Sequence, residues 1–160
     1  YILLCRSTAK TDLVVEVHEL SLQAIKPKKV PCRVLRIERV APDIAILHLR
    51  LPQNDNMRFA AGQYVDVLLA DGQRRSYSIA SVPRTEGVID IQVHVRHTVG
   101  GLFTDRVFST MKERDLLKFE GPLGTFYLRE ESEKPIVMLA SGTGLAPIKS
   151  MIEYSVARKM

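Results

Sequence analysis

Four consecutive residues, Arg75-Ser76-Tyr77-Ser78, have side chains that could hold an anion and a flat ring. They lie in a predicted strand, so Arg75 and Tyr77 share one side while Ser76 and Ser78 share the other. The fork of an arginine matches a diphosphate, and the ring of a tyrosine can stack on another ring. A solvated edge strand would carry the same residues, so this run alone leaves both interpretations open.

A run led by glycine, Gly100-Gly101-Leu102-Phe103-Thr104, opens a short predicted helix over residues 102–111. The free N–H groups and the dipole of a helix start attract an anion, and glycine lets a ligand approach the backbone closely. The alternative is a tight turn in which the Thr104 hydroxyl caps the helix.

A third group follows the continuous apolar run at 135–140, which predicts a strand buried on both faces of a parallel sheet. After it come Ser141-Gly142-Thr143-Gly144 and a predicted helix over 145–159. Open α/β sheets bind nucleotides at such glycine-rich turns. This turn is neither a complete GxGxxG pattern nor a P-loop with its lysine. It predicts the opening of a βαβ unit.

Other candidate residues point away from nucleophilic catalysis. His94 lies among apolar neighbours and could act as a base, although such a histidine is more typically structural. The sequence has no defensible Ser/His/Asp arrangement, no paired carboxylates and no histidines at metal-ligand spacing.

Short strands must position these groups. Apolar residues alternate with polar ones over 44–51, 64–69 and 89–96, which is the period of a half-buried strand. Turn signals separate these segments, and a single short helix interrupts them. The pattern predicts a mainly β fold, a six-stranded antiparallel barrel with one helix as its plug.

The amino-acid composition narrows the classes of molecule that this chain could bind. The 160 residues are 46% hydrophobic and 26% charged, which suits a folded domain. The net charge of +5 favours an anionic partner, namely a phosphate-bearing cofactor, an acidic protein or nucleic acid. Aromatic residues are only 6%, so nucleic-acid binding is not favoured. No apolar run approaches the roughly 18 residues of a membrane span. Two cysteines cannot form a disulfide framework, and we expect a cytoplasmic location.

The order of the motifs resembles that of the ferredoxin–NADP reductase superfamily over about residues 32–155. The motifs that carry the resemblance are Arg75-Ser76-Tyr77-Ser78, Gly100-Gly101-Leu102-Phe103-Thr104, Gly121-Pro122-Leu123-Gly124-Thr125-Phe126 and Gly142-Thr143-Gly144-Leu145-Ala146-Pro147. The resemblance implies an FAD-binding barrel at 32–131 and, at 132–160, the first strand and helix of an incomplete NAD(P)-binding α/β domain. FMN in place of FAD is an open alternative.

The segment before the barrel resembles a plant-type ferredoxin domain. Residues 1–24 look like the C-terminal remnant of such a domain, and residues 25–31 look like a linker with two prolines and three lysines. By this resemblance Cys5 would ligate a two-iron two-sulfur cluster, but the other three cysteines of the pattern are absent here. The chain starts at Tyr1 and stops within a helical pattern, so we expect a piece of a longer protein. This order resembles that of CDP-deoxyglucoseen reductases and oxygenase reductases, in which a ferredoxin domain precedes the flavin domain.

The resemblance also implies residue roles. Arg75 would contact the FAD diphosphate, Tyr77 would stack on the isoalloxazine or its ribityl side, and Ser78 would sit near flavin N5. Thr143 would stand where the nicotinamide meets the flavin, so Ser78 and Thr143 are the expected catalytic positions. The remaining expected cofactor contacts are Ser76, His94, Val95, Arg96, Gly101, Leu102 and Thr104, some through backbone groups.

The expected function follows from these roles. Electrons would pass from NAD(P)H through FAD to an iron–sulfur centre, either the ferredoxin domain or a partner protein. The alternative is a non-catalytic basic barrel that binds nucleic acid or protein. We expect an NAD(P)H-dependent reductase that is incomplete as this piece.

Overall fold

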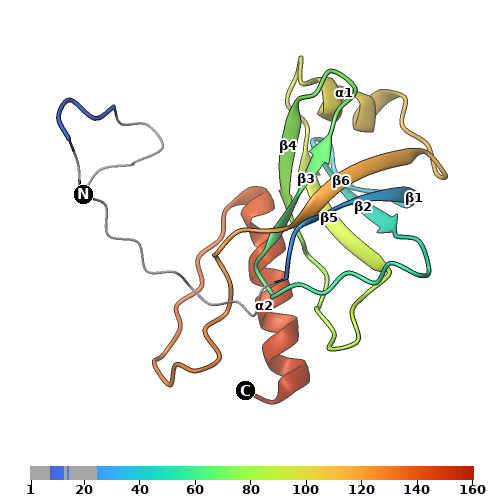
Figure 1. The fold of residues 1–160 in the computed structure, drawn as a ribbon. Helices are drawn as coiled ribbons and strands as arrows, with labels where there is room; N and C mark the ends of the chain where they lie inside the picture. Colours follow the sequence, from blue (N-terminus) through green and yellow to red (C-terminus); the bar gives the residue numbers. More distant parts are fainter. Residues whose placement is uncertain (1–7, 13, 15–24) are drawn as a thin grey trace.

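The computed structural model describes residues 8–12, 14 and 25–160. Cys5 and most of the expected ferredoxin remnant at 1–24 lie outside these residues, so their assignments stay predictions. The described elements are β1 (Lys28–Ala41), β2 (Ile44–Arg50), β3 (Tyr64–Leu68), β4 (Arg74–Ser78), β5 (Asp90–Arg96), α1 (Leu102–Ser109), β6 (Leu116–Leu123), the 3₁₀ turn η2 (Gly142–Gly144) and α2 (Leu145–Arg158) (Figure 1).

The six strands form one antiparallel sheet in the order β4-β3-β6-β1-β2-β5. The two edge strands, β4 and β5, meet only where the chain leaves β4. An isolated bridge joins Ile79 to Val93 there, and the N–H of Ala80 donates to the carbonyl of Gln92 at 2.8 Å. The expected mainly β, six-stranded antiparallel fold is confirmed. The sheet is open along most of the seam between β4 and β5.

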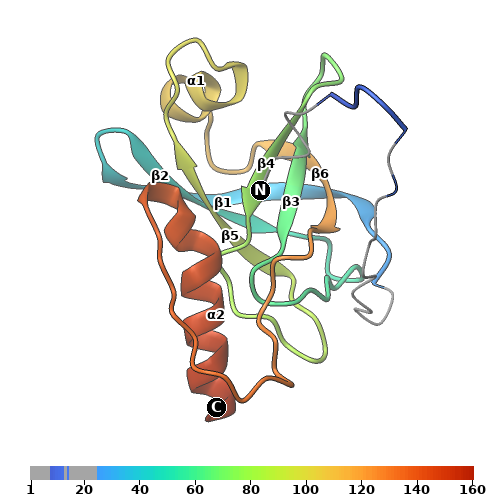
Figure 2. The same cartoon turned by 90° about the vertical axis from the view of Figure 1, so that its left-hand side faces the viewer.

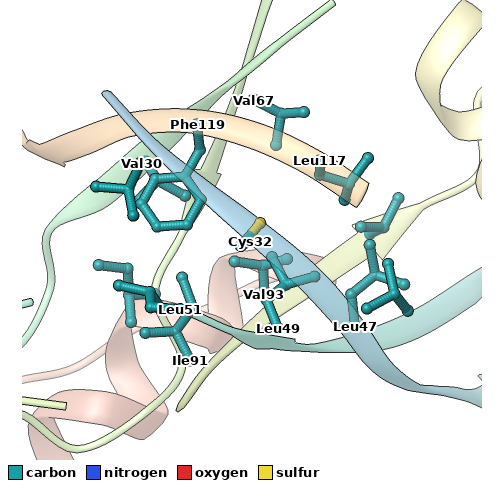
Figure 3. Close-up of a cluster of buried hydrophobic side chains, with 14 of the residues drawn as sticks. Val30, Cys32, Leu47, Leu49, Leu51, Val67, Ile91, Val93, Leu117 and Phe119 are labelled. Carbon is teal, nitrogen blue, oxygen red and sulfur yellow. The ribbon is translucent and has the colours of Figure 1, made fainter. Parts of the chain in front are cut away.

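Alternation along the strands builds the core as the sequence predicted. Leu47 and Leu49 of β2 face Val93 and Ile91 of β5, and all four are almost completely buried. Phe119 of β6 fills the space between the strands (Figure 3). A slip by one residue would turn these buried side chains to the other face of the sheet, so this cluster fixes the register of the strands that contribute to it.

Helix α1 lies at one end of the sheet and α2 extends from the opposite side (Figures 1 and 2). Phe103 and Val107 of α1 enter the main core, which confirms the expected plug. Met111, just beyond the end of the helix, joins the same cluster. Among the described residues, no helix combines the length and apolar character that a membrane crossing requires.

The sheet begins earlier than the sequence suggested. Strand β1 starts at Lys28, inside the stretch interpreted as a linker, and Val30 is buried opposite Phe119 of β6. Pro31, which has no N–H to donate, is tolerated because it lies in the part of β1 that pairs with β6 alone, before the pairing with β2 begins at Arg33. Residues 28–31 are therefore part of the sheet.

The expected strand at 135–140 is not formed. The structure assigns no regular element to this run, and Val137 and Leu139 are 95% and 92% exposed. A strand of a parallel sheet needs neighbours that pair with its N–H and C=O groups and cover its faces. The described residues place no strand beside the run, so its apolar character alone does not make it a strand.

Helix α2 packs against the sheet domain through a second, smaller apolar cluster. Ile148 and Met151 of α2 contact Ala61 and Leu128. Gly62 allows this close approach, because a Cβ added there would lie 2.3 Å from Cε of Met151. Its φ of +108° also favours glycine. The expected helix at 145–159 is thus confirmed.

Candidate functional site

A cleft of about 520 Å³ lies at the seam where β4 and β5 separate. Three parts of the chain surround it: strand β4, strand β5 with the turn that leads into α1, and the glycine-rich turn before α2. Its lining residues are Arg75, Ser76, Tyr77, Ser78, His94, Arg96, Thr98, Gly101, Phe103, Thr104, Thr143 and Gly144.

Strand β4 supplies an aromatic ring and a cation. Tyr77 packs against Phe103 of α1 with ring centroids 5.3 Å apart, and burial raises the pKa of Tyr77 to about 12. Its phenol therefore keeps its proton at neutral pH. Arg75 donates to the carbonyl of Arg74 at 2.8 Å and to Oε1 of Gln73 at 2.6 Å. These partners are neutral, so the guanidinium charge of Arg75 is available to an anion.

Polar side chains on the opposite face of β4 bind to the neighbouring strands. Ser76 donates its hydroxyl to Asp66 Oδ1 of β3 at 2.6 Å, and Arg74 pairs with Glu120 of β6 at 2.7 Å. The register pairs Arg75 with Val67, an inward-facing residue of β3, whereas Ser76 pairs with Asp66. This confirms that Arg75 and Ser76 point to opposite sides. Both still border the cleft because β4 is an edge strand.

The start of α1 is shaped by a compact turn. The Thr104 hydroxyl donates to the carbonyl of Thr98 at 2.8 Å and accepts the N–H of the same residue at 3.2 Å. A Cβ on Gly101 would lie 2.6 Å from Oγ1 of Thr104. The hydroxyl of Thr104 thus closes the turn, and no side chain caps the helix start. The N–H groups of the first helical turn can therefore bind an anion.

Strand β5 supplies a histidine whose Nε2 is buried without a hydrogen-bond partner. Burial lowers the pKa of His94, and the positive charges of Lys149 and His48 add to this effect. Its imidazole is therefore neutral at pH 7. Arg96, at the end of β5, donates to Asp43 Oδ2 at 3.0 Å and leaves part of its guanidinium at the cleft.

Most of the expected site residues meet in this cleft. The structure brings together Arg75, Ser76, Tyr77, Ser78, His94, Arg96, Gly101, Thr104 and Thr143. Two side chains are elsewhere. Leu102 is 61% exposed outside the lining, and Val95 is completely buried in the core. The side chains of these two expected contacts therefore do not line the cleft.

Three lining residues were missed by the sequence reasoning. Phe103 lies within the motif at 100–104 but was given no role at the site, and its ring both joins the core and contacts Tyr77. Gly144 lies within the glycine-rich motif at 141–144, and Thr98 adjoins the motif at 100–104. Thr98 belongs to the turn because its carbonyl accepts the N–H of Gly101 at 2.9 Å and the hydroxyl of Thr104 at 2.8 Å.

The donor set suits a ligand that carries a diphosphate and a planar heterocycle. Arg75 and the uncapped start of α1 offer charge and N–H groups to the diphosphate. Tyr77 offers a ring face, and the orphaned Nε2 of His94 requires a polar partner, because a buried polar atom without one is costly. FAD has all three complementary features, whereas FMN lacks the diphosphate.

A metal centre receives no support from the described residues. The part of the chain that the structure describes holds no cluster of three His, Cys, Asp or Glu side chains that could bind a metal ion. Cys32 is a buried free thiol whose pKa burial raises to about 12. A thiol so reluctant to ionise is a poor metal ligand.

Comparison with known proteins also indicates a domain that binds FAD. Residues 31–127 match the family model described as the oxidoreductase FAD-binding domain. The chain is 48% identical over 153 residues to the CDP-6-deoxy-L-threo-D-glycero-4-hexulose-3-dehydrase reductase of Yersinia pseudotuberculosis, covering 95% of this chain and 45% of that protein. It is 37% identical over 162 residues to reductase component 2 of a Comamonas terephthalate 1,2-dioxygenase, covering 99% of this chain and 47% of that protein. The chain thus spans about half the length of these relatives.

A solved structure shares the fold as well. The Amycolatopsis cytochrome P450 reductase GcoB superposes with a TM-score of 0.73 at 33% sequence identity, over 82% of this chain and 40% of that one.

Proposed function

Because this chain belongs to the FAD-binding domain family of the ferredoxin reductase type of oxidoreductases, we propose that it carries electrons from NAD(P)H through FAD to an iron–sulfur centre. The observation that supports this most is the convergence of Arg75, Tyr77, the start of α1 and Thr143 on one cleft. The family match does not support the alternative of a non-catalytic barrel that binds nucleic acid.

The residues of the barrel would bind and orient the cofactor. Arg75 and the N–H groups at the start of α1 would hold the diphosphate, and Tyr77 would present its ring to the flavin. His94 would offer Nε2 to a polar atom of the flavin, and Arg96 would add positive charge. Bound FAD would supply what no side chain here can, the acceptance of an electron pair as hydride and its release as single electrons.

Two hydroxyl-bearing residues from different parts of the chain line the cleft. Ser78 ends β4, and Thr143 lies in the turn before α2. We assign Ser78 to the flavin side and Thr143 to the place where the nicotinamide ring would enter. Neither hydroxyl needs to act as a nucleophile. Their role would be to hold two rings in contact and to limit the access of water.

The relatives suggest the class of partner. One relative is named as a reductase of a hexulose dehydrase and another as the reductase component of a dioxygenase. We propose an iron–sulfur partner, either a ferredoxin domain that includes residues 1–24 or a separate protein. The cytoplasmic location and the division at residues 24, 31 and 131 remain predictions, with the sheet itself beginning at Lys28.

Titration of the purified chain with FAD tests the proposal directly. We expect saturable quenching of flavin fluorescence and a yellow protein that releases free flavin on denaturation. FMN should bind more weakly if the adenine half contributes contacts. A chain that binds neither flavin, but binds oligonucleotides with a steep dependence on salt, would overturn the proposal.

A further inference from the structure

Three walls of the cleft meet at one residue that does not line it, Ser81. The hydroxyl of Ser150 in α2 donates to the carbonyl of Ser81 at 2.6 Å. The hydroxyl of Ser81 in turn accepts the N–H of Gln92 in β5 at 2.6 Å. Ser81 also lies three residues beyond the end of β4, after Ile79 and Ala80. This residue therefore connects β4, β5 and α2 through polar contacts.

A second side chain of α2 strengthens the connection. Lys149 donates to the carbonyl of Ala80 at 3.2 Å and pairs with Glu153 on the next turn of α2 at 2.8 Å. Ser150 is completely buried, whereas Lys149 is partly exposed. Two adjacent residues of α2 thus donate to two adjacent carbonyls in the segment that follows β4. Both hydrogen bonds can form in only one orientation of α2 relative to that segment.

The apolar contacts of α2 could not do this alone. Ile148 and Met151 pack on Ala61 and Leu128, and apolar contact is non-directional. A helix held only by such contacts can slide or rotate while it keeps much of its buried area. Hydrogen bonds weaken steeply when their angles change. Tyr154 donates to Oε1 of Glu130 at 3.0 Å farther along α2, so Ser150 and Lys149 are the residues that fix the helix by hydrogen bonds in its first half, next to the turn Gly142–Gly144.

The position of α2 decides where Thr143 stands. The turn Gly142–Gly144 continues directly into α2, and the N–H of Leu145 donates back to the carbonyls of Gly142 and Thr143. Ser150 lies about 9 Å along the helix from Gly144 at 1.5 Å per residue. A shift or rotation of α2 would thus carry Thr143 with it.

We propose that Ser150, supported by Lys149, is a positioning residue that holds Thr143 at the cleft for the approach of a dihydronicotinamide ring. The inference rests on the proposed function for its chemistry. It assigns no contact between Ser150 and the ligand, since Ser150 does not line the cleft.

The primary variant is Ser150→Ala, with Ser155→Ala as a matched control. Ser155 lies on the same helix, but its hydroxyl donates at 2.9 Å to the carbonyl of Met151 within α2 itself. Lys149→Met tests the second bond at a partly exposed position where no cavity forms. It keeps the inference testable if Ser150→Ala fails to fold.

The first readout needs no cofactor. Amide chemical shifts in the unliganded chain report the geometry of each segment. In Ser150→Ala we expect the Gly142 and Gly144 signals to move and broaden, while the Val93 signal of β5 stays in place. Lys149→Met should give a smaller change of the same kind, and Ser155→Ala should match the unaltered chain.

The second readout uses FAD-loaded protein and N-benzyl-1,4-dihydronicotinamide, which has the reacting ring without an adenine half. The donor passes a hydride to FAD and leaves as the pyridinium cation, so loss of flavin absorbance without oxygen reports the rate. Holding the ring in place contributes several powers of ten to such a reaction. We therefore expect Ser150→Ala to slow bleaching at saturating donor at least about fivefold, with FAD affinity unchanged.

Two outcomes would overturn the inference. One is a bleaching rate in Ser150→Ala equal to that in Ser155→Ala. The other is glycine signals that do not move in either Ser150→Ala or Lys149→Met. If the unaltered chain does not bind FAD, the proposed function fails, and the amide shifts still decide whether Ser150 positions the turn.

Discussion

The two sides of the cleft are built in different ways. On the barrel side, β4 and β5 belong to a continuous hydrogen-bonded sheet, and Phe119 of β6 and Val93 of β5 are fully buried in its core. On the other side, the turn that carries Thr143 follows a run whose Val137 and Leu139 are almost fully exposed. The barrel side is held by a core, whereas the α2 side depends on a small apolar cluster and three side-chain hydrogen bonds. Ligand binding and ligand alignment can therefore be altered separately.

The largest difference should be in stability. Phe119→Ala removes a ring that is completely buried and should lower the free energy of unfolding by about 3–5 kcal/mol. Leu139→Ala removes an exposed side chain and should change it by about 0.5 kcal/mol or less. Urea denaturation of both variants measures the contrast. A large cost for Leu139→Ala would show that the exposed run is packed in solution.

The next largest effect concerns the cation at the barrel side. In the proposed site, Arg75→Ala would remove a charged hydrogen bond to the diphosphate of about 1.5–3 kcal/mol, so FAD should bind roughly 10–100-fold more weakly. Arg33→Ala is the control, because Arg33 is an exposed arginine of β1 outside the cleft. Fluorescence titration of both variants decides the matter. Equal affinities would remove Arg75 from the site.

The two glycine-rich turns offer a smaller contrast. A Cβ at Gly101 would lie 2.9 Å from the carbonyl oxygen of Thr98 as well as against Thr104, whereas a Cβ at Gly144 would meet nothing within 4 Å. Gly101→Ala should therefore lower the unfolding free energy by about 1–2 kcal/mol. Gly144→Ala should leave it within about 0.5 kcal/mol. Thermal unfolding can rank the two variants, and the reverse order would contradict this account of the turns.

The smallest effect is a dependence of stability on pH. Because the folded protein lowers the pKa of His94, the unfolded chain binds a proton there that the native chain refuses. The contribution of His94 to the free energy of unfolding is fully present above the ordinary histidine pKa of about 6.5 and declines as the pH falls below that value. His94→Gln should flatten the decline between pH 7 and pH 5.5 in urea titrations, a range that brackets that value. His97→Gln, which loses its 2.8 Å contact with Asp105, should retain the part due to His94.

The sequence predicted the barrel side well because its signals are local. Period-2 alternation fixed the inward residues of β2, β3 and β5, and the motif at 75–78 lies in one short strand. Alternation could also have corrected the assignment of Val95, which has the same parity as buried Val93. Leu102 could not be excluded in this way, because the rotation of α1 decides which of its first residues faces the cleft.

The α2 side was harder to predict because its determinants are distant in sequence. An apolar run such as 135–140 indicates a buried strand only where neighbouring strands pair with it. The contacts of Ser150 with Ser81, and of Lys149 with Ala80, span 69 residues each. Neither serine has a sequence signature that distinguishes it from an ordinary surface hydroxyl. Only the folded arrangement shows that Ser81 connects three segments.

The incomplete closure of the sheet has a consequence for self-association. Strands β4 and β5 end the sheet and have free hydrogen-bonding edges beyond the Ile79–Val93 bridge, and such edges can pair with another copy. Charged side chains on edge strands oppose that pairing. Arg75 lies on β4 and Arg96 on β5, so their like charges would also oppose edge-to-edge pairing between two copies of the chain. Neutralising both should favour aggregation of the cofactor-free protein even where the fold is intact.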